Sequence, residues 1–167
     1  MSVALQSDGR EVGAGTTPQS VTLHATTVAL PPEGNAGGQE ARGVIILGPS
    51  GSGKSALALR LMALGAVLVA DDRSLITRRA GALYAGAPQS IRGVIEARGV
   101  GLLKAEALAQ ARIVLAVDLA RHERARLPEH RAWRALGIEM PLLHAVASDH
   151  FPAALLQYLR CGRYDQP

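Results

Sequence analysis

Aromatic residues are scarce in this chain, at 3% of the composition, with one tryptophan and one phenylalanine. A core with so few aromatics has to be filled mainly by alanine, valine, leucine and isoleucine. The scarcity also argues against nucleic-acid binding, because single-stranded nucleic acids are bound by stacking bases on aromatic side chains beside basic residues. The net charge of +4 points only in a general way to anionic partners.

Cysteine and long apolar runs are also missing. The single cysteine, Cys161, excludes an internal disulfide framework. No apolar run approaches the roughly 18–20 residues that a membrane-spanning helix needs. Met1–Pro18 lacks the basic start and apolar stretch of a secretory signal. We therefore expect a cytoplasmic protein that binds neither membranes nor nucleic acid.

Lysine is the third rarity, because only Lys54 and Lys104 stand among 18 basic residues. This preference for arginine over lysine is typical of proteins whose composition reflects the base composition of the genome. In such a chain, a lysine inside a glycine-rich loop indicates that a compact ammonium group is required there. The five histidines show no metal-ligand spacing and no Cys/His cluster accompanies them, so a zinc site is not predicted.

The 167 residues fit one domain with a single core. We expect a tail over 1–19, one domain over 20–160 and a short tail over 161–167. The pattern predicts an α/β fold with several hairpins. The expected strands are Val21–Leu30, Val44–Leu47, Ala66–Ala70, Ser74–Thr77, Ala82–Ala85 and Ile113–Leu119. The expected helices are Ser55–Ala63, Lys104–Ala111 and Asp149–Leu159, the last with Asp149 as its N-cap.

The strongest motif is a phosphate-binding loop between an expected strand and an expected helix. Its residues are Gly48, Pro49, Ser50, Gly51, Ser52, Gly53, Lys54 and Ser55, which satisfy G-x-x-x-x-G-K-[ST]. Glycines let successive backbone N–H groups turn toward an anion at the positive end of a helix. Lys54 would neutralise the β- and γ-phosphates and Ser55 would ligate Mg²⁺. The loop alone predicts nucleotide binding and leaves the reaction open.

Carboxylates that could complete the chemistry follow at two places. Asp71 and Asp72 end an apolar strand, where an open α/β sheet places its ligand crevice. One of them could orient Mg²⁺ or its waters, while the other accepts a proton from an attacking hydroxyl. Glu96 could be a further Mg²⁺ ligand, with Arg98 orienting it or contacting phosphate. A solvated Asp-Asp turn and a surface ion pair remain the alternatives.

His24 by itself is a residue that usually has a structural role in a strand. However, His24, the loop GPSGSGKS, the run Leu68–Asp72 (LVADD) and the run Glu96–Leu103 (EARGVGLL) occur in this order. The set resembles the HPr kinase/phosphorylase family, which has a histidine before its G-x-S-G-x-G-K-S loop, then L-V-A-D-D, then E-[IV]-R-G-x-G-I. The loop is common to many proteins, whereas its combination with the other two runs is specific. The resemblance covers roughly Val21 to Leu119.

The resemblance implies an ATP- and Mg²⁺-dependent kinase that phosphorylates a serine of the phosphocarrier HPr. It also implies that inorganic phosphate removes this group, and that the protein is a homo-oligomer, a hexamer in the family. The implied fold is a P-loop kinase domain of the HPr kinase/phosphoenolpyruvate carboxykinase-like type, a mixed sheet with flanking helices. The roles carried over are phosphate binding for Lys54, metal binding for Ser55 and Glu96, general base for Asp72 and phosphate contact for His24.

The sequence departs from the family at three places. It has no room for the separate N-terminal domain of longer members, so we expect the short form with the catalytic domain only. The connection Pro31–Gly43 is longer than expected. The family's arginine in a P-V-R-P-G-R-N-like run has no counterpart in Met140–Val146. The last difference makes dephosphorylation the less supported half of the activity.

Two other interpretations stay open. A small-molecule kinase of the gluconate or shikimate type would use Ile113–Asp118 as its Walker-B strand and Arg121, Arg124 and Arg126 as a lid. That interpretation leaves EARGVGLL unexplained. A non-catalytic nucleotide sensor would have no use for a general base at Asp72.

Overall fold

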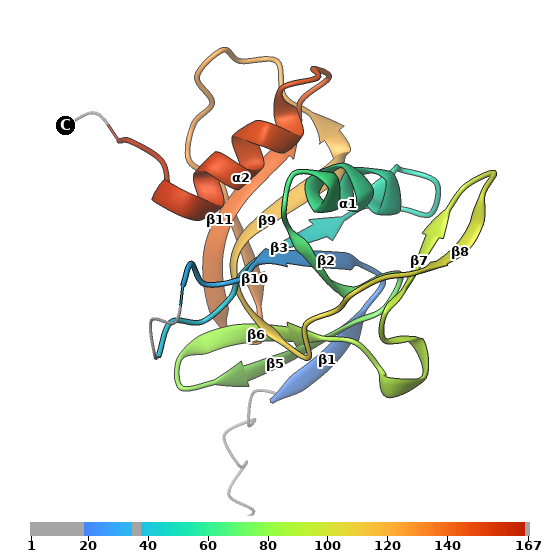
Figure 1. Cartoon of the computed structure of the whole chain (residues 1–167). Coiled ribbons are helices and arrows are strands. Elements are labelled where there is room, and N and C mark those ends of the chain that lie inside the picture. The colour runs from blue at the N-terminus through green and yellow to red at the C-terminus, as the bar shows by residue number, and fades with distance from the viewer. Residues whose placement is uncertain (1–18, 35–37, 166–167) are drawn as a thin grey trace, which may run out of the picture.

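The computed structural model describes residues 19–34 and 38–165, so the expected tail over 1–19 lies almost wholly outside the described residues. Within these ranges, eleven strands and two α-helices follow one another along the chain (Figure 1). The strands are β1 (Ser20–Leu23), β2 (Thr26–Leu30), β3 (Arg42–Leu47), β4 (Val67–Ala70), β5 (Ser74–Arg79), β6 (Ala82–Gly86), β7 (Val94–Ala97), β8 (Gly101–Lys104), β9 (Ala111–His122), β10 (Ala132–Ala135) and β11 (Ile138–Ala145). The helices are α1 (Lys54–Ala63) and α2 (Phe151–Cys161), and a 3₁₀ turn spans Gln89–Ile91.

Strand β9 is the centre of a nine-stranded mixed sheet. The order is β1-β5-β6-β9-β3-β2-β4, with β11 also paired to β9 and β10 paired to β11. Strand β3 runs parallel to β9 along one edge of β9. On β9 as well, β6 pairs with the first residues and β11 with the later half. Strands β7 and β8 form a separate antiparallel hairpin, which projects beside α1 (Figure 1).

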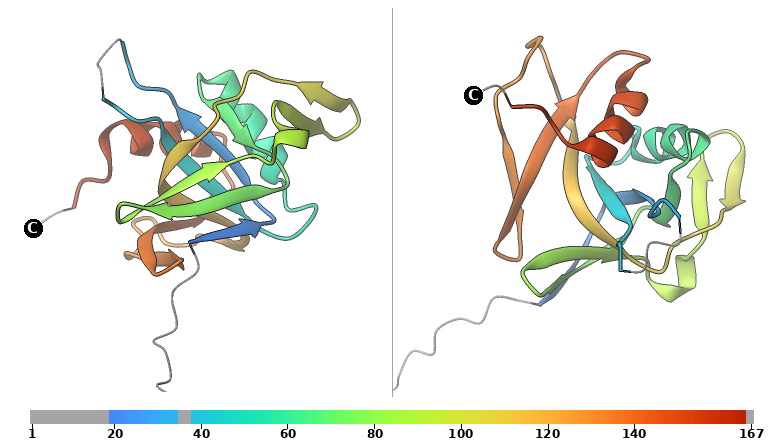
Figure 2. Two further views of the ribbon diagram at one scale, coloured as in Figure 1. Left: turned by 90° about the horizontal axis from the view of Figure 1, so that it is seen from below. Right: turned by 60° about the vertical axis from the view of Figure 1, so that its left-hand side comes forward.

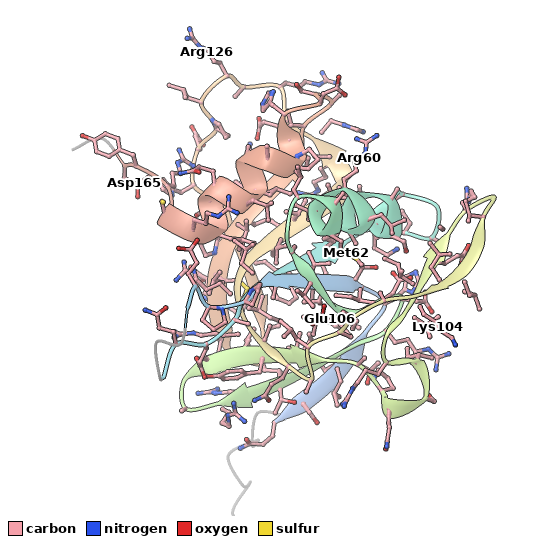
Figure 3. The ribbon with its side chains drawn as sticks, in the orientation of Figure 1. Arg60, Met62, Lys104, Glu106, Arg126 and Asp165 are labelled. Atoms are coloured by element: carbon pink, nitrogen blue, oxygen red, sulfur yellow. The ribbon has the colours of Figure 1, made fainter. Side chains whose placement is uncertain are left out.

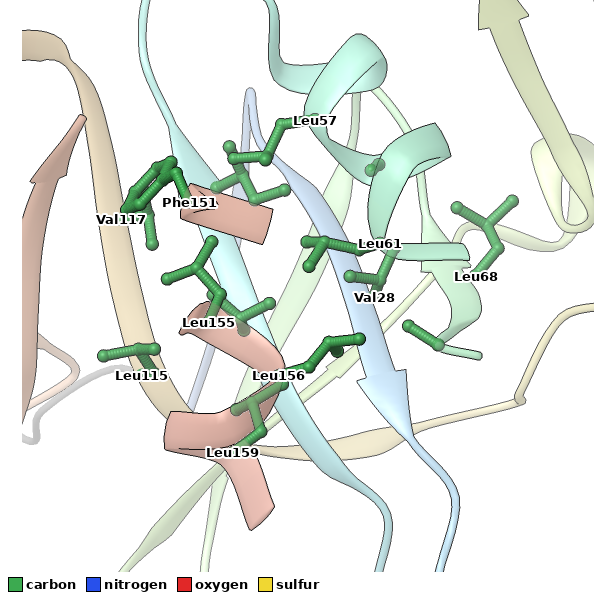
Figure 4. Packing of buried hydrophobic residues seen from close by; sticks show 14 of the residues in the cluster. Val28, Leu57, Leu61, Leu68, Leu115, Val117, Phe151, Leu155, Leu156 and Leu159 are labelled. Carbon is green, nitrogen blue, oxygen red and sulfur yellow. The ribbon is translucent and has the colours of Figure 1, made fainter. Parts of the chain in front are cut away.

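Strand β3 is buried on both faces because its alternate residues reach two different cores. Val44 and Ile46 pack with the apolar sides of α1 and α2, whereas Ile45 belongs to the core on the opposite face. Leu61 of α1 and Leu155 of α2 are almost completely buried in the first core (Figure 4). Burial of a side chain of this size stabilises the fold by about 2 kcal/mol. Both helices therefore cover the same face of the sheet and fix the glycine loop that precedes α1.

The second face is covered by the curled sheet itself. Strands β1, β5 and β6 cross beneath the strands that carry the helices (Figure 2). Ile76 of β5, Leu83 of β6 and Met140 of β11 are buried there against Ile45. No helix in the described part of the chain is long and apolar enough to cross a membrane.

Three expectations about secondary structure are wrong. The run Val21–Leu30 is two strands, and His24 lies in the bend between them rather than in a strand. Asp149 does not cap the last helix, because the N-cap is His150. Lys104–Ala111 is not a helix despite its alanines, because its backbone is held by tertiary contacts: Leu108 N–H donates to Leu68 O of β4 at 2.8 Å. Here pairing with the sheet overrides local helix propensity.

Other expectations hold, with shifted ends. The expected hairpin is β5 and β6, joined by a two-residue turn in which both residues have positive φ. The connection after Leu30 joins two antiparallel neighbours, β2 and β3. The pair β10 and β11 was not expected, and neither were β7 and β8.

Candidate functional site

The glycine loop joins the end of β3 to the start of α1. Gly48, Gly51 and Gly53 all have positive φ, at 148°, 79° and 94°. A Cβ at Gly48 would lie 2.5 Å from Ser52 Oγ, so the tight turn there requires glycine. The loop thereby presents backbone N–H groups at the N-terminus of α1, where the helix dipole favours an anion.

The Lys54 ammonium group is folded back over its own loop. Its Nζ lies 2.8 Å from Gly48 O, 3.0 Å from Pro49 O and 3.2 Å from His24 Nε2. Burial lowers the pKa of Lys54 below its ordinary value, and the nearby charges of Asp72 and Asp71 partly oppose that shift. A bound phosphate would offer this cation a stronger partner than the two carbonyl oxygens.

Asp71 is buried beneath the loop and ties three elements together. Its Oδ1 accepts hydrogen bonds from Thr26 Oγ1 at 2.8 Å and Ser55 Oγ at 2.7 Å. Its Oδ2 accepts from the backbone N–H of Glu96 at 3.0 Å. The carboxylate thus connects β2, α1 and β7 at the floor of the site.

Asp72 is exposed and adopts a left-handed backbone conformation, with φ of 65°. Such a conformation is strained for a residue other than glycine, and strain of this kind gathers at functional sites. Asp72 Oδ1 lies 3.0 Å from His24 Nδ1. Since a carbonyl oxygen can only accept, His24 Nδ1 donates to the backbone O of Asp72 at 3.1 Å. The side chains of Lys54, His24 and Asp72 therefore lie in a row of polar contacts at the mouth of the loop, and Ser50 Oγ lies 3.2 Å from His24 Nε2.

The β7–β8 hairpin supplies the opposite wall. Glu96 lies in β7 rather than in a loop, and Arg98 follows at the hairpin turn. A Cβ at Gly51 would lie 3.9 Å from Arg98 Nη2, so the guanidinium group stands close to the phosphate loop. The side chain of Lys104, the second lysine, lies on the same hairpin (Figure 3).

These residues enclose a cavity of about 610 Å³, a size typical of small-molecule sites. Its lining combines the glycine loop and the start of α1 with His24, Thr26, Asp72, Glu96 and Arg98. The structure thus brings all the sequence-predicted side chains to one place, with Asp71 directly below. Thr26 was missed. Thr26 lies two residues after His24 on an expected strand, and side chains at this spacing share one face of a strand, so this spacing could have indicated that Thr26 belongs to the site.

The side chains expected to hold a divalent cation carry oxygen atoms and lie close to one another. Ser55 and Glu96 line the cavity, with the Asp71 carboxylate hydrogen-bonded to Ser55 Oγ directly below it, and hard oxygen ligands of this kind suit Mg²⁺. Among the described residues, no group of three or more His, Cys, Asp or Glu side chains could hold a metal ion alone. The set fits Mg²⁺ because this ion binds through one or two carboxylates together with substrate phosphates and water.

The aspartate and the arginines that the small-molecule kinase interpretation requires are not arranged around the glycine loop as that interpretation predicts. Asp118 stands opposite Leu47 in the register of β9 and β3, but it is Asp71 that contacts Ser55. Arg126 lies at the outer end of the connection after β9, above α2 and away from the glycine loop (Figure 3). Within the described residues, the cavity lining includes none of the three arginines expected to form a lid.

Residues 40–130 match the family described as the HPr serine kinase C-terminal domain. The chain is 36% identical over 115 residues to the HPr kinase/phosphorylase of Chloroherpeton thalassium, covering 60% of this chain and 34% of that protein. It is 48% identical over 62 residues to the HPr kinase/phosphorylase of Bordetella pertussis, covering 36% and 20%. The chain thus spans about a third or less of the length of these two relatives.

A solved structure, the HPr(Ser) kinase/phosphatase from Coxiella burnetii, superposes with a TM-score of 0.65 at 21% identity. The match covers 84% of this chain and 94% of that one. The expected fold, a mixed sheet with flanking helices of the HPr kinase type, is confirmed.

Proposed function

The chain belongs to the HPr serine kinase C-terminal domain family, and from that premise we propose that it transfers the γ-phosphoryl group of ATP to a serine of an HPr-type phosphocarrier protein. The observation that carries the proposal is the row Lys54–His24–Asp72 at the mouth of the glycine loop. It sets a carboxylate beside the position where a transferred phosphoryl group would lie. A module that only bound nucleotide would have no use for that carboxylate.

Each residue has a role that follows from its place. The loop N–H groups and Lys54 bind the phosphates, and Arg98 contacts them or the acceptor from the hairpin. Ser55 and Glu96 would hold Mg²⁺, with Asp71 orienting Ser55. Mg²⁺ would neutralise charge on the phosphates.

Asp72 accepts the proton of the attacking serine hydroxyl as the oxygen–phosphorus bond forms and ADP leaves. Its carboxylate is exposed toward the cavity, so an incoming hydroxyl can reach it. His24 Nδ1 donates to the backbone carbonyl of Asp72 at 3.1 Å and lies 3.0 Å from its carboxylate, so it holds Asp72 in one orientation. The same groups support dephosphorylation, in which an oxygen of inorganic phosphate attacks the phosphorus of phosphoserine and forms pyrophosphate. The bond from phosphorus to the serine oxygen breaks, and Asp72 gives its proton to that oxygen.

We also propose that residues 20–160 form the single catalytic unit and that this unit assembles as a homo-oligomer, a hexamer by family resemblance. Every described strand except β7 and β8 lies in one sheet, which supports a single unit. Light scattering of the purified chain measures the assembly mass directly.

The test incubates the full chain with γ-labelled ATP, Mg²⁺ and an HPr-type carrier from the same organism. Acid-stable label on the carrier identifies phosphoserine and separates it from phosphohistidine. Asp72→Asn should keep ATP binding and slow transfer by about 10²–10⁴-fold, the usual contribution of a positioned base. The control Asp149→Asn changes an exposed carboxylate away from the cavity and should transfer normally.

If the chain binds ATP tightly but transfers no label to the carrier, the proposal that it is an HPr kinase is wrong. Label transferred instead to a low-molecular-weight hydroxyl compound would point to the small-molecule kinase. Equal transfer by Asp72→Asn and wild type would remove Asp72 from its role.

A further inference from the structure

A second hollow lies on the other side of His24 from the phosphate cavity. Its volume is about 510 Å³, and His24 is the one described residue that lines both spaces. The walls come from β1, the last residue of β3, strand β10 and the turn between β10 and β11. We call this hollow the His24 groove.

The His24 groove is mainly apolar. Val21, Leu23, Leu47, Trp133 and Leu136 line it, and all five are half-buried against the second core. Among the described residues, its ionisable lining groups are His24 and Arg134, and it contains no carboxylate. Arg134 is exposed and paired with Glu139 at 2.7 Å. The complementary ligand therefore has apolar side chains, with neutral or acidic rather than basic groups beside them.

The walls of the groove are held by contacts outside the phosphate cavity. Strand β1 is paired along its whole length with β5. Arg78, also in β5, donates from Nη1 to Leu136 O at 3.1 Å in the β10–β11 turn. Leu136 itself has φ of 47°, in a two-residue turn completed by Gly137. One strand thus fixes both walls, so the groove is preformed.

The position of the groove relative to the reacting groups suggests its use. A nucleotide bound at the glycine loop would occupy the first cavity, on the side of Lys54 and Arg98. A hydroxyl must then reach Asp72 without displacing the nucleotide. The His24 groove ends on His24, whose Nδ1 lies 3.0 Å from the Asp72 carboxylate. An acceptor lying in this groove approaches the carboxylate from the free side.

We propose that the His24 groove is the acceptor subsite, and that Trp133 is the specificity-determining residue that binds the acceptor protein. The inference deepens the proposed function and rests on it. The occupant is a serine-bearing protein segment with apolar side chains next to the serine and acidic groups around them. Tryptophan fits this role because buried aromatic side chains dominate binding at protein interfaces.

The tryptophan also provides the assay, because Trp133 is the single tryptophan of the chain. Adding an acceptor protein that lacks tryptophan should shift the emission of Trp133 toward the blue, since binding removes the indole from water. Adding ATP with Mg²⁺ alone should shift it far less. An emission spectrum that responds to ATP and not to the acceptor would overturn the inference.

Steady-state kinetics give an independent test. Trp133→Ala should raise the KM for the acceptor by about tenfold or more, while the Kd for ATP stays the same. Trp133→Phe should restore most of the affinity. Leu127→Ala is the control, because Leu127 is apolar and 85% exposed but lines neither cavity. It should leave both constants unchanged.

The outcomes separate the two proposals. Absence of transfer by the wild-type chain defeats the proposed function itself. Normal transfer with the same acceptor KM for Trp133→Ala and wild type defeats only the acceptor subsite. A lower assembly mass for Trp133→Ala would show that the groove is an interface between copies of this chain and would also overturn the inference. Should Trp133→Ala fail to fold, the emission experiment on the wild type still decides.

Discussion

Replacing Asp71 by asparagine should destabilise the fold, although asparagine has nearly the same shape. Asp71 is 6% exposed and accepts three hydrogen bonds, two at Oδ1 and one at Oδ2. An asparagine has only one oxygen. If that oxygen faces the hydroxyls of Thr26 and Ser55, the amide nitrogen meets the backbone N–H of Glu96, and two donors face each other at about 3.0 Å.

The magnitude follows from what happens to these three hydrogen bonds. The one from Glu96 N–H to the charged acceptor, worth about 1.5–3 kcal/mol, disappears, and the two others become neutral and weaker. Removing a buried charge offsets part of this loss, because the carboxylate no longer has to be desolvated. We therefore expect Asp71→Asn to lower the free energy of unfolding by about 2 kcal/mol. Domains of this size are stable by only about 5–15 kcal/mol, so the loss is readily measured.

Urea unfolding of the full chain, followed by circular dichroism, measures the change. Thr26→Val removes one hydrogen bond to the same charged carboxylate and should cost about 1.5–3 kcal/mol. Asp149→Asn, at an exposed position, should stay within about 0.5 kcal/mol of the wild type. If Asp71→Asn is as stable as Asp149→Asn, Asp71 does not connect the three elements as described.

Two further predictions concern the loop backbone and acid stability. Gly48→Ala should unfold at a lower temperature and lose most of its ATP affinity, because the new methyl group would lie 2.5 Å from a serine Oγ of the loop. Gly65→Ala, also at positive φ but in open space, should lose stability without losing ATP affinity, and calorimetry of both variants with a binding titration distinguishes them. The pKa of Glu123 is lowered to about 2 by hydrogen bonds from the backbone N–H of Ala125 and the side chain of Arg131. The contribution of Glu123 to stability is therefore complete above its ordinary pKa of about 4.5 and is lost as the pH falls toward 2. Glu123→Gln should flatten the pH dependence of the free energy of unfolding between these two values. An unchanged pH dependence in Glu123→Gln would contradict the role given to Glu123.

The parts of the site that depend on local chemistry could be predicted from the sequence. The glycine loop needs positive φ angles and free backbone N–H groups, which its glycines supply. The motif therefore predicts the loop together with the strand before it and the helix after it. Asp71 and Asp72 were correctly placed at a strand end, but which one contacts Ser55 was not evident. That depends on the left-handed turn at Asp72, which directs the two carboxylates differently.

The parts that depend on distant contacts could not be predicted. The richness of Val21–Leu30 in β-branched residues predicts one continuous strand through His24, yet β1 pairs with β5 and β2 with β3 and β4. The break at His24 arises because the two halves have different partners. The His24 groove joins residues of β1, β3, β10 and the β10–β11 turn, and no sequence pattern connects these segments.

The central place of β9 has a consequence for the order in which the protein folds during synthesis. Strands β1 to β6 and helix α1 all leave the ribosome before β9, which begins at Ala111. Until β9 appears, β3 and β6 each carry an unpaired edge, and such edges are prone to pair with other chains. The phosphate loop at the end of β3 therefore gains its fixed geometry only late in translation, once a strand far away in the sequence has closed the sheet.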